Sequence, residues 1–193
     1  MVSHQLNRIA SLCSHAILLD RGAVVQSGTP SECIAAYLQN QESLRLPGQE
    51  ISSIRIDRIR SNHGDVLRSG EQVCFWVDGS VPDGVRKQSE VVCVRVRSAE
   101  NGQILFGTSN DSADVDVPMY GVFTLEIGLQ INVPPGLYLV EALVRDRDLG
   151  RRVANGPRLC VRVVESKHFD GSVQMNASFR LMTLREVQDH PEG

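Results

Sequence analysis

Beyond residue 50, apolar and polar positions alternate along the chain with a period of two. The alternation runs through seven stretches, at 54–57, 73–78, 92–97, 123–132, 138–145, 158–163 and 173–181. Turn-forming residues separate the stretches, as at Pro134-Pro135-Gly136. Because side chains on a strand point alternately to its two faces, we expect a strand at each stretch and an eighth at 104–108.

Strands with one apolar face pack in layers around a shared core. The pattern therefore predicts an all-β fold, an antiparallel β-sandwich of the immunoglobulin-like or jelly-roll-like kind. One face of each strand is expected to enter the core and the other to face water.

The first part of the chain has a different pattern. Apolar residues at 6, 9, 12 and 13 follow helical spacing. Asp20-Arg21-Gly22 joins two short apolar runs as a hairpin, and Thr29-Pro30 is typical of a helix start. We expect an α+β segment at 1–41, and the polar stretch 42–50 with Pro47-Gly48 indicates a linker. The sandwich is expected at 51–185 and a tail at 186–193.

Composition narrows the function classes. The chain has 193 residues, 20 basic and 23 acidic side chains and a net charge of −3, so no nucleic-acid partner is indicated. No apolar run is long enough to cross a membrane, and the polar start does not resemble a secretory signal. Five cysteines without a CxxC pair suggest reduced thiols in a cytosolic protein, and we expect no metal and no cofactor.

Short motifs near the start resemble the end of an ABC ATPase domain. They are Ser3-His4, Leu19-Asp20-Arg21-Gly22, Gly28, Pro30 and Tyr37-Leu38. In that family the histidine corresponding to His4 is a switch residue that contacts the γ-phosphate. The sequence has no GxxxxGK motif followed by Ser or Thr, and no Walker B or signature motif. We therefore expect no enzyme activity from this chain, with His4 as a remnant of the nucleotide switch.

The remainder resembles the additional C-terminal domain of Wzt-type ATPases, which export O-antigen and related polysaccharides. The resemblance lies in 104–110, in 121–129, in 135–138 and in 171–181. It implies a cytoplasmic domain, peripheral to the inner membrane, that binds the glycan at its finished non-reducing end. It also implies a membrane subunit of the exporter as a partner, and a homodimer formed by exchange of the strand 171–182.

Sugar binding needs an aromatic platform and polar side chains that pair with hydroxyls. Trp76 alternates with Phe75, so it lies on the outer face if Phe75 lies in the core. Its alternative role is packing or a dimer contact. Outward polar positions supply the other candidates, which are Arg95, Arg97, Glu126, Gln130, Glu141 and Arg145. Their alternative role is a solvated face with cross-strand ion pairs.

The favoured function is non-catalytic binding of an export polysaccharide, which couples the glycan to an ABC exporter. One alternative is a protein-interaction or dimerisation domain that regulates the transporter without binding sugar. Another is an ATPase fragment that completes a second subunit. The sequence does not identify the glycan or the sheet face that binds it.

Overall fold

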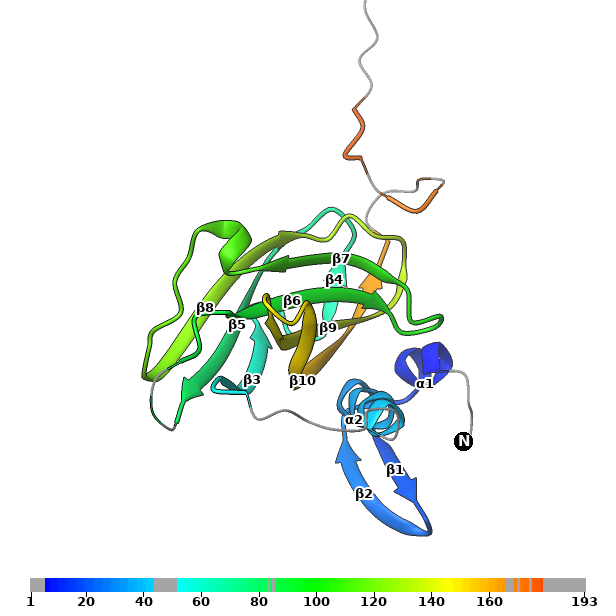
Figure 1. Ribbon diagram of the computed structural model, residues 1–193. Coiled ribbons are helices and arrows are strands. Elements are labelled where there is room, and N and C mark those ends of the chain that lie inside the picture. The colour runs from blue at the N-terminus through cyan, green and yellow to red at the C-terminus, as the bar shows by residue number, and fades with distance from the viewer. Residues whose placement is uncertain are drawn as a thin grey trace, which may run out of the picture.

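The computed structural model describes residues 6–43, 52–82, 84, 86–165, 169, 171–173 and 175–178. An N-terminal segment, residues 6–43, precedes a larger body of strands (Figure 1). The segment contains α1 (Leu6–Leu12), β1 (Ala16–Asp20), β2 (Ala23–Gly28) and α2 (Pro30–Ser43). The larger body contains β3 (Arg55–Ser61), β4 (Val66–Arg68), β5 (Gln72–Val81), β6 (Glu90–Ser98), β7 (Ile104–Ser109), the 3₁₀ turn η1 (Asp111–Ala113), β8 (Gly121–Gln130), β9 (Gly136–Asp146) and β10 (Arg151–Val164).

The larger body is built from two sheets. One has three strands in the order β3-β5-β8, and the other has five in the order β4-β10-β9-β6-β7. All pairs are antiparallel except β4 with β10, which is parallel. The mostly β, sandwich-like architecture expected from the alternation is confirmed, with the parallel pair as a departure from a purely antiparallel sandwich.

The core lies between the two sheets. Phe75 and Val77 of β5 are fully buried against Val92 of β6 and Val140 of β9, all in one apolar cluster. Alternation predicted these inward positions correctly, because each strand of a half-buried sheet must place every second side chain inside.

Strand β9 departs from the predicted pattern, because both of its faces are buried. Its outward residues Leu139, Glu141 and Leu143 are each 3% exposed or less. The strand lies between β10 and β6 in the middle of its sheet, and the N-terminal segment covers part of its outer face. The expectation that this outer face meets water is therefore wrong for most of β9.

The N-terminal segment rests on the outer face of the five-stranded sheet. Ile34 and Ala35 of α2 form a buried cluster with Leu137, Leu139 and Cys160, and α1 packs at its margin. Ser31 adds a polar contact, since its Oγ donates to Asp65 Oδ2 at 2.6 Å. Figure 1 shows α1 and α2 beside the strands and the β1–β2 hairpin pointing away from them.

A buried carboxylate holds the segment that leads into the first strand of the sandwich. Glu90 at the start of β6 is fully buried, and its Oε2 accepts from Ser52 Oγ at 3.1 Å and from Ser53 N at 2.9 Å. Ser53 Oγ also donates to it at 2.6 Å. These bonds fix the position of the chain just before β3 begins.

The strand expected at 173–181 is not formed in its described part. Residues 171–173 are a bend and 175–178 have no regular structure, while 174 and 179–182 lie outside the described residues. A segment without a neighbouring strand gains no ladder hydrogen bonds, so alternation alone does not make it a strand.

Candidate functional site

The outer face of the three-stranded sheet carries a row of three side chains from three strands. Arg60 of β3, Trp76 of β5 and Glu126 of β8 lie side by side in register. The indole Nε1 of Trp76 donates to Glu126 Oε2 at 2.9 Å. The guanidinium carbon of Arg60 lies 4.9 Å from the centroid of the indole ring, within cation–π range. The ring is therefore held at both ends of the row.

The next row adds a carboxylate and a hydroxyl. Asp78 accepts from Arg60 Nε at 3.1 Å and from Thr124 Oγ1 at 2.7 Å. The hydrogen bonds from Arg60 and then Thr124 lower the pKa of the Asp78 carboxyl, and the same contact raises the pKa of Arg60. Both groups are thus charged near neutral pH, and each orients the other. We call Arg60, Trp76, Asp78, Thr124 and Glu126 the Trp76 surface.

The Trp76 surface combines what a pyranose requires. An aromatic ring offers a platform for C–H groups, and here the ring is that of the half-buried Trp76, over which the Arg60 guanidinium lies. Planar carboxylate and guanidinium groups pair with neighbouring hydroxyls. Gly128 lies one row beyond Glu126, and no atom lies within 4 Å of the place where its side chain would be. The sheet is therefore open next to the indole–carboxylate pair.

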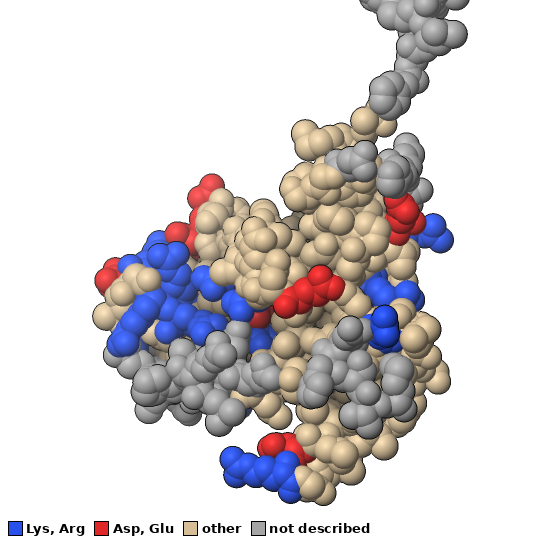
Figure 2. Space-filling model, turned by 90° about the vertical axis from the view of Figure 1, so that its right-hand side faces the viewer, with Lys and Arg blue, Asp and Glu red and all other residues tan. Residues whose placement is uncertain are grey.

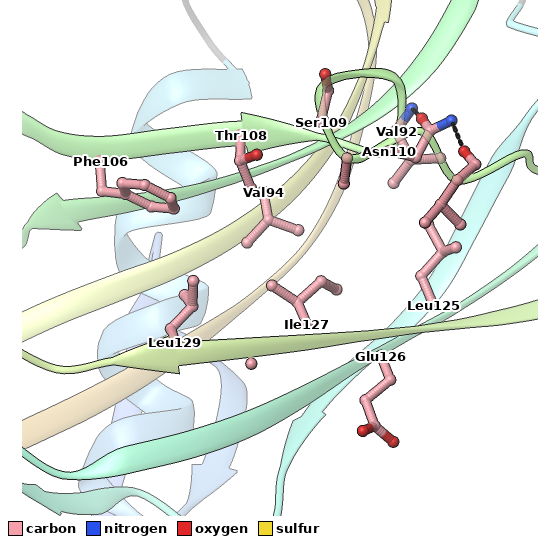
Figure 3. Close-up of a pocket in the computed structure, with 13 residues that line it drawn as sticks. Val92, Val94, Phe106, Thr108, Ser109, Asn110, Leu125, Glu126, Ile127 and Leu129 are labelled. Carbon is pink, nitrogen blue, oxygen red and sulfur yellow. Dashed lines mark hydrogen bonds between the residues drawn. The ribbon is translucent and has the colours of Figure 1, made fainter.

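An apolar groove, here called the β7–β8 groove, runs along the open side of the sandwich. Figure 3 shows Phe106 and Val94 facing Leu125, Ile127 and Leu129 across it, while Glu126 points to the opposite side of β8. Its first part has a volume of about 300 Å³, and a second part of about 440 Å³ shares three lining residues with it. Among the described strands, none pairs with the outer edge of β7 or β8.

The outer face of the five-stranded sheet holds the remaining predicted residues. Glu141 is 2% exposed and forms ion pairs with Arg158 Nε at 2.9 Å and with an Arg97 terminal nitrogen at 3.3 Å. Arg95 lies in register with Glu141 on the neighbouring strand. Arg145 lies four residues further along β9 and is exposed. These groups form a basic surface around one buried carboxylate.

The structure thus divides the predicted site residues between opposite faces of the molecule. Trp76, Glu126 and Gln130 share the outer face of one sheet, where Gln130 Nε2 donates to the Gly70 carbonyl at 3.3 Å, away from the indole. The other predicted residues, Arg95, Arg97, Glu141 and Arg145, belong to the other sheet. The phosphate-switch candidate His4 lies outside the described residues.

Sequence reasoning missed three members of the Trp76 surface. Asp78 could have been found, because it lies two residues from Trp76 on the same strand face. Arg60 and Thr124 could not, since they come from strands separated from Trp76 by 16 and 48 residues in the sequence. Only the register of β3 and β8 against β5 brings them to the indole.

Other kinds of site find little support in the described part of the chain. No group of three or more His, Cys, Asp or Glu side chains there is placed to hold a metal ion. All five cysteines are free, and burial raises the pKa of the Cys160 thiol to about 12. No helix among the described residues is long and apolar enough to span a membrane.

Comparison with known proteins gives a partial sequence match and a match in fold. No family model matches the chain. The molybdenum import ATP-binding protein ModC of Shewanella oneidensis is 33% identical over 98 residues. That match covers 47% of this chain and 25% of ModC, so the chain spans about a quarter of this curated relative. The crystal structure of the C-terminal domain of Wzt superimposes with a TM-score of 0.53 at 16% identity. The superposition covers 72% of this chain and 93% of the Wzt domain, so the chain shares the fold of the Wzt C-terminal domain over most of its length.

Proposed function

We propose that this chain is a non-catalytic carbohydrate-binding unit that couples an export polysaccharide to an ABC transporter. The observation that carries the proposal is the Trp76 surface, an indole fixed between a cation and a carboxylate on an open sheet. The fold shared with the C-terminal domain of Wzt supports the same function. The partial likeness to the ATP-binding protein ModC supports an origin beside an ATPase domain.

The geometry suits a weak but selective grip on a glycan. Arg60, Asp78 and Glu126 are already held by hydrogen bonds and the cation–π contact, so binding costs little additional side-chain entropy. Hydroxyl groups exchange water for these partners with a net gain of only about 1 kcal/mol per hydrogen bond. A single site of this kind recruits a polymer mainly by raising its local concentration near the transporter.

The transporter context follows from the docked N-terminal segment. A glycan on the Trp76 surface is held close to the segment, because Arg60 lines the same pocket as Ser31 and Ala35 of α2. In this proposal the chain works in the cytoplasm, peripheral to the inner membrane, beside a membrane subunit, and it recognises the non-reducing end of the glycan. The chemistry of transport belongs to the ATPase, and the chain itself catalyses no reaction.

Calorimetric titration tests the proposal. The purified export polysaccharide of the source organism is titrated into the wild-type chain and into Trp76→Ala. Tyr120→Ala is the matched control, because Tyr120 is an aromatic residue outside the Trp76 surface and is 76% exposed. Loss of binding in Trp76→Ala with retention in Tyr120→Ala supports the proposal. Equal binding by all three proteins, or none by the wild type, contradicts it.

Exchange of the segment 171–182 between two copies is the proposed mode of dimerisation. The β7–β8 groove offers unpaired strand edges and apolar walls among the described residues, and Val173 already lines one end of it. The segment alternates apolar residues with polar ones, as an added strand requires. Sedimentation analysis of the full chain against a chain ending at residue 170 tests this. A dimer that survives the truncation contradicts the exchange.

The same groove favours the second candidate function, in which the domain binds a protein and regulates the transporter without binding sugar. Ile104, Leu105 and Phe106 of β7 are each at least 40% exposed, which is unusual unless a partner covers them. The substitution Phe106→Ser separates the two functions. Loss of self-association or partner binding with intact glycan affinity assigns the groove to proteins and the Trp76 surface to sugar.

A further inference from the structure

A second charged surface lies on the side of the sandwich opposite Trp76. It contains five arginines of the five-stranded sheet, called the arginine face, which are Arg95, Arg97, Arg145, Arg152 and Arg158. The carboxylate of Glu141 lies among them. Five arginines on one sheet face are a strong local concentration of basic side chains in a chain whose net charge is −3. Figure 2 shows Lys and Arg side chains gathered in a continuous patch on one part of the surface.

Two of these arginines are fixed in place. Glu141 is almost fully buried and pairs with Arg158 at 2.9 Å and with Arg97 at 3.3 Å, so it serves as an internal anchor for two guanidinium groups. Removing such an anchor leaves buried charges uncompensated. The anchor therefore holds the centre of the arginine face rigid, but the Arg158 and Arg97 side chains are only 6% and 16% exposed, so a bound anion would meet mainly the more exposed arginines around them.

Two other members, Arg95 and Arg145, are not neutralised in this way. Arg145 lies directly opposite Arg152 on the neighbouring strand, and like charges in that position repel. Arg95 lies in register with Gly107 of β7, and its Cγ is 3.5 Å from the place that a Cβ on this glycine would occupy, which is an ordinary packing distance. Neither Arg95 nor Arg145 has an acidic side chain within ion-pair distance in the described part of the chain.

A buried thiol supports the closeness of Arg95 and Arg145. Cys93 lies between them on β6, and burial raises the pKa of its thiol. The positive charges of Arg95 and then Arg145 oppose that rise in the pKa, and the negative charge of Asp111 adds to it. Both guanidinium groups therefore act on the same small region of the sheet.

The shape of the surroundings selects among anionic partners. Helix α2 rests on the outer face of the same sheet, over Leu139 and Cys160, and stands about 10 Å high beside the arginines. A flat bilayer cannot lie against a surface next to such a wall, whereas a narrow chain can. Arginine forks, rather than lysines, match carboxylates and phosphates in two-point contacts.

We propose that the arginine face binds the anionic groups of an acidic glycan chain, as a second site separate from the Trp76 surface. The proposal rests on the glycan-binding function proposed above and adds the class of glycan, one that carries carboxylate or phosphate groups along its length. The polymer then contacts both sheets of the sandwich. Charge pairing on one side adds to stacking on the other.

Binding measurements with defined oligomers test this site. Oligogalacturonate supplies carboxylates, polyphosphate supplies phosphates, and neutral dextran oligomers serve as the uncharged probe. The variant Arg95→Gln/Arg145→Gln removes two charges and spares the Glu141 anchor. Arg21→Gln, at the tip of the β1–β2 hairpin, removes a remote exposed charge as the matched control. Thermal unfolding verifies that each variant is folded.

The site is supported if the double variant binds one of the two acidic oligomers about tenfold or more weakly, while Arg21→Gln binds normally. Wild-type affinity should also fall steeply as NaCl rises from about 50 to about 300 mM. Unchanged affinity in the double variant, or equal binding of dextran, overturns it. So does preferential binding of phosphatidylglycerol vesicles or of a single-stranded oligonucleotide.

The two proposals fail in different ways. If Trp76→Ala leaves the binding of every glycan unchanged but the double arginine variant loses acidic oligomers, the Trp76 surface is wrong and the arginine face stands. If Trp76→Ala abolishes binding and the double variant does not weaken it, the arginine face is wrong and the Trp76 surface stands.

Discussion

Docking of the N-terminal segment on the sandwich can be tested by a single truncation, Ile34→Ala. Ile34 lies on α2, is 3% exposed and packs in one cluster with Leu137 and Leu139 of β9. Replacing a buried isoleucine by alanine usually lowers the free energy of unfolding by about 2–5 kcal/mol. Alanine has the better helix propensity, which returns roughly a few tenths of a kcal/mol. We therefore expect a net loss of about 2–4 kcal/mol.

The value depends on docking, because an α2 free in solvent would expose Ile34. In that case the substitution would change stability by less than about 0.5 kcal/mol. Leu12→Ala on α1 is the matched control, since Leu12 is 72% exposed and its truncation should be nearly neutral. Urea unfolding reports the global stability, and hydrogen exchange of the α2 amides in the native protein reports the local stability of the helix.

A double-mutant cycle with Leu139→Ala isolates the contact across the interface. Residues in direct contact typically couple by about 0.5–3 kcal/mol, whereas independent residues add. A coupling energy near zero together with a neutral Ile34→Ala would refute the docked arrangement. The proposed holding of glycan close to the transporter would then lose its structural basis.

Three further outcomes follow from local chemistry. Arg60 lowers the folded-state pKa of Asp78 below its unfolded pKa of about 3.9. The Asp78 carboxylate therefore stabilises the fold at higher pH, and this stabilisation is lost as pH falls through the lower folded pKa. In acid unfolding, Asp78→Asn should lack this pH-dependent loss of stability. Gly79→Ala should destabilise the fold by about 1–3 kcal/mol, because the new methyl group would lie 2.7 Å from the backbone carbonyl oxygen of Arg55. Gly128→Ala, on the paired strand, meets no atom within 4 Å and should be nearly neutral in thermal unfolding. Equal effects of the two substitutions would contradict the close approach of β5 to the Arg55 carbonyl of β3. Cys160, with a pKa of about 12 and 1% exposure, should resist iodoacetamide at about pH 8 until the chain is unfolded, as mass spectrometry of the native and denatured protein would report; rapid native labelling would show that the cover of α2 opens.

The alternation of apolar and polar residues predicted the strands well, for a physical reason. A strand in a two-layer fold must bury one face, and Phe75 and Val77 carry that requirement in the sequence itself. The same rule failed at Glu141, where the residue is polar, outward and buried. Its burial depends on neighbouring arginines and on the middle position of β9, which no local pattern encodes.

The site was only partly predictable for the same reason. Trp76 and Glu126 were selected as outward residues, but their direct hydrogen bond depends on the register of β5 and β8. The alternation alone places all the predicted residues on outward faces, and strand order divides them between two sheets. Sequence separation hides which strands are neighbours, because connections between sheets have no fixed length.

The strand predicted at 173–181 shows a further limit. Its alternating pattern requires a neighbouring strand, and the described residues of a single chain provide none beside it. A pattern of this kind indicates the capacity to pair. The pairing partner, which we propose to be a second copy, lies beyond what the pattern can specify.

Glycan binding on the indole of Trp76 is the step on which the proposed function depends, and the indole N–H signal reports it. The chain has one tryptophan, so a ¹H–¹⁵N correlation spectrum contains a single tryptophan side-chain signal. On titration with the export polysaccharide, we expect a saturable shift of this signal with the Kd found by calorimetry, as the sugar stacks on the ring and meets the Glu126 contact. Calorimetric binding with an unmoved indole signal would contradict the proposed site.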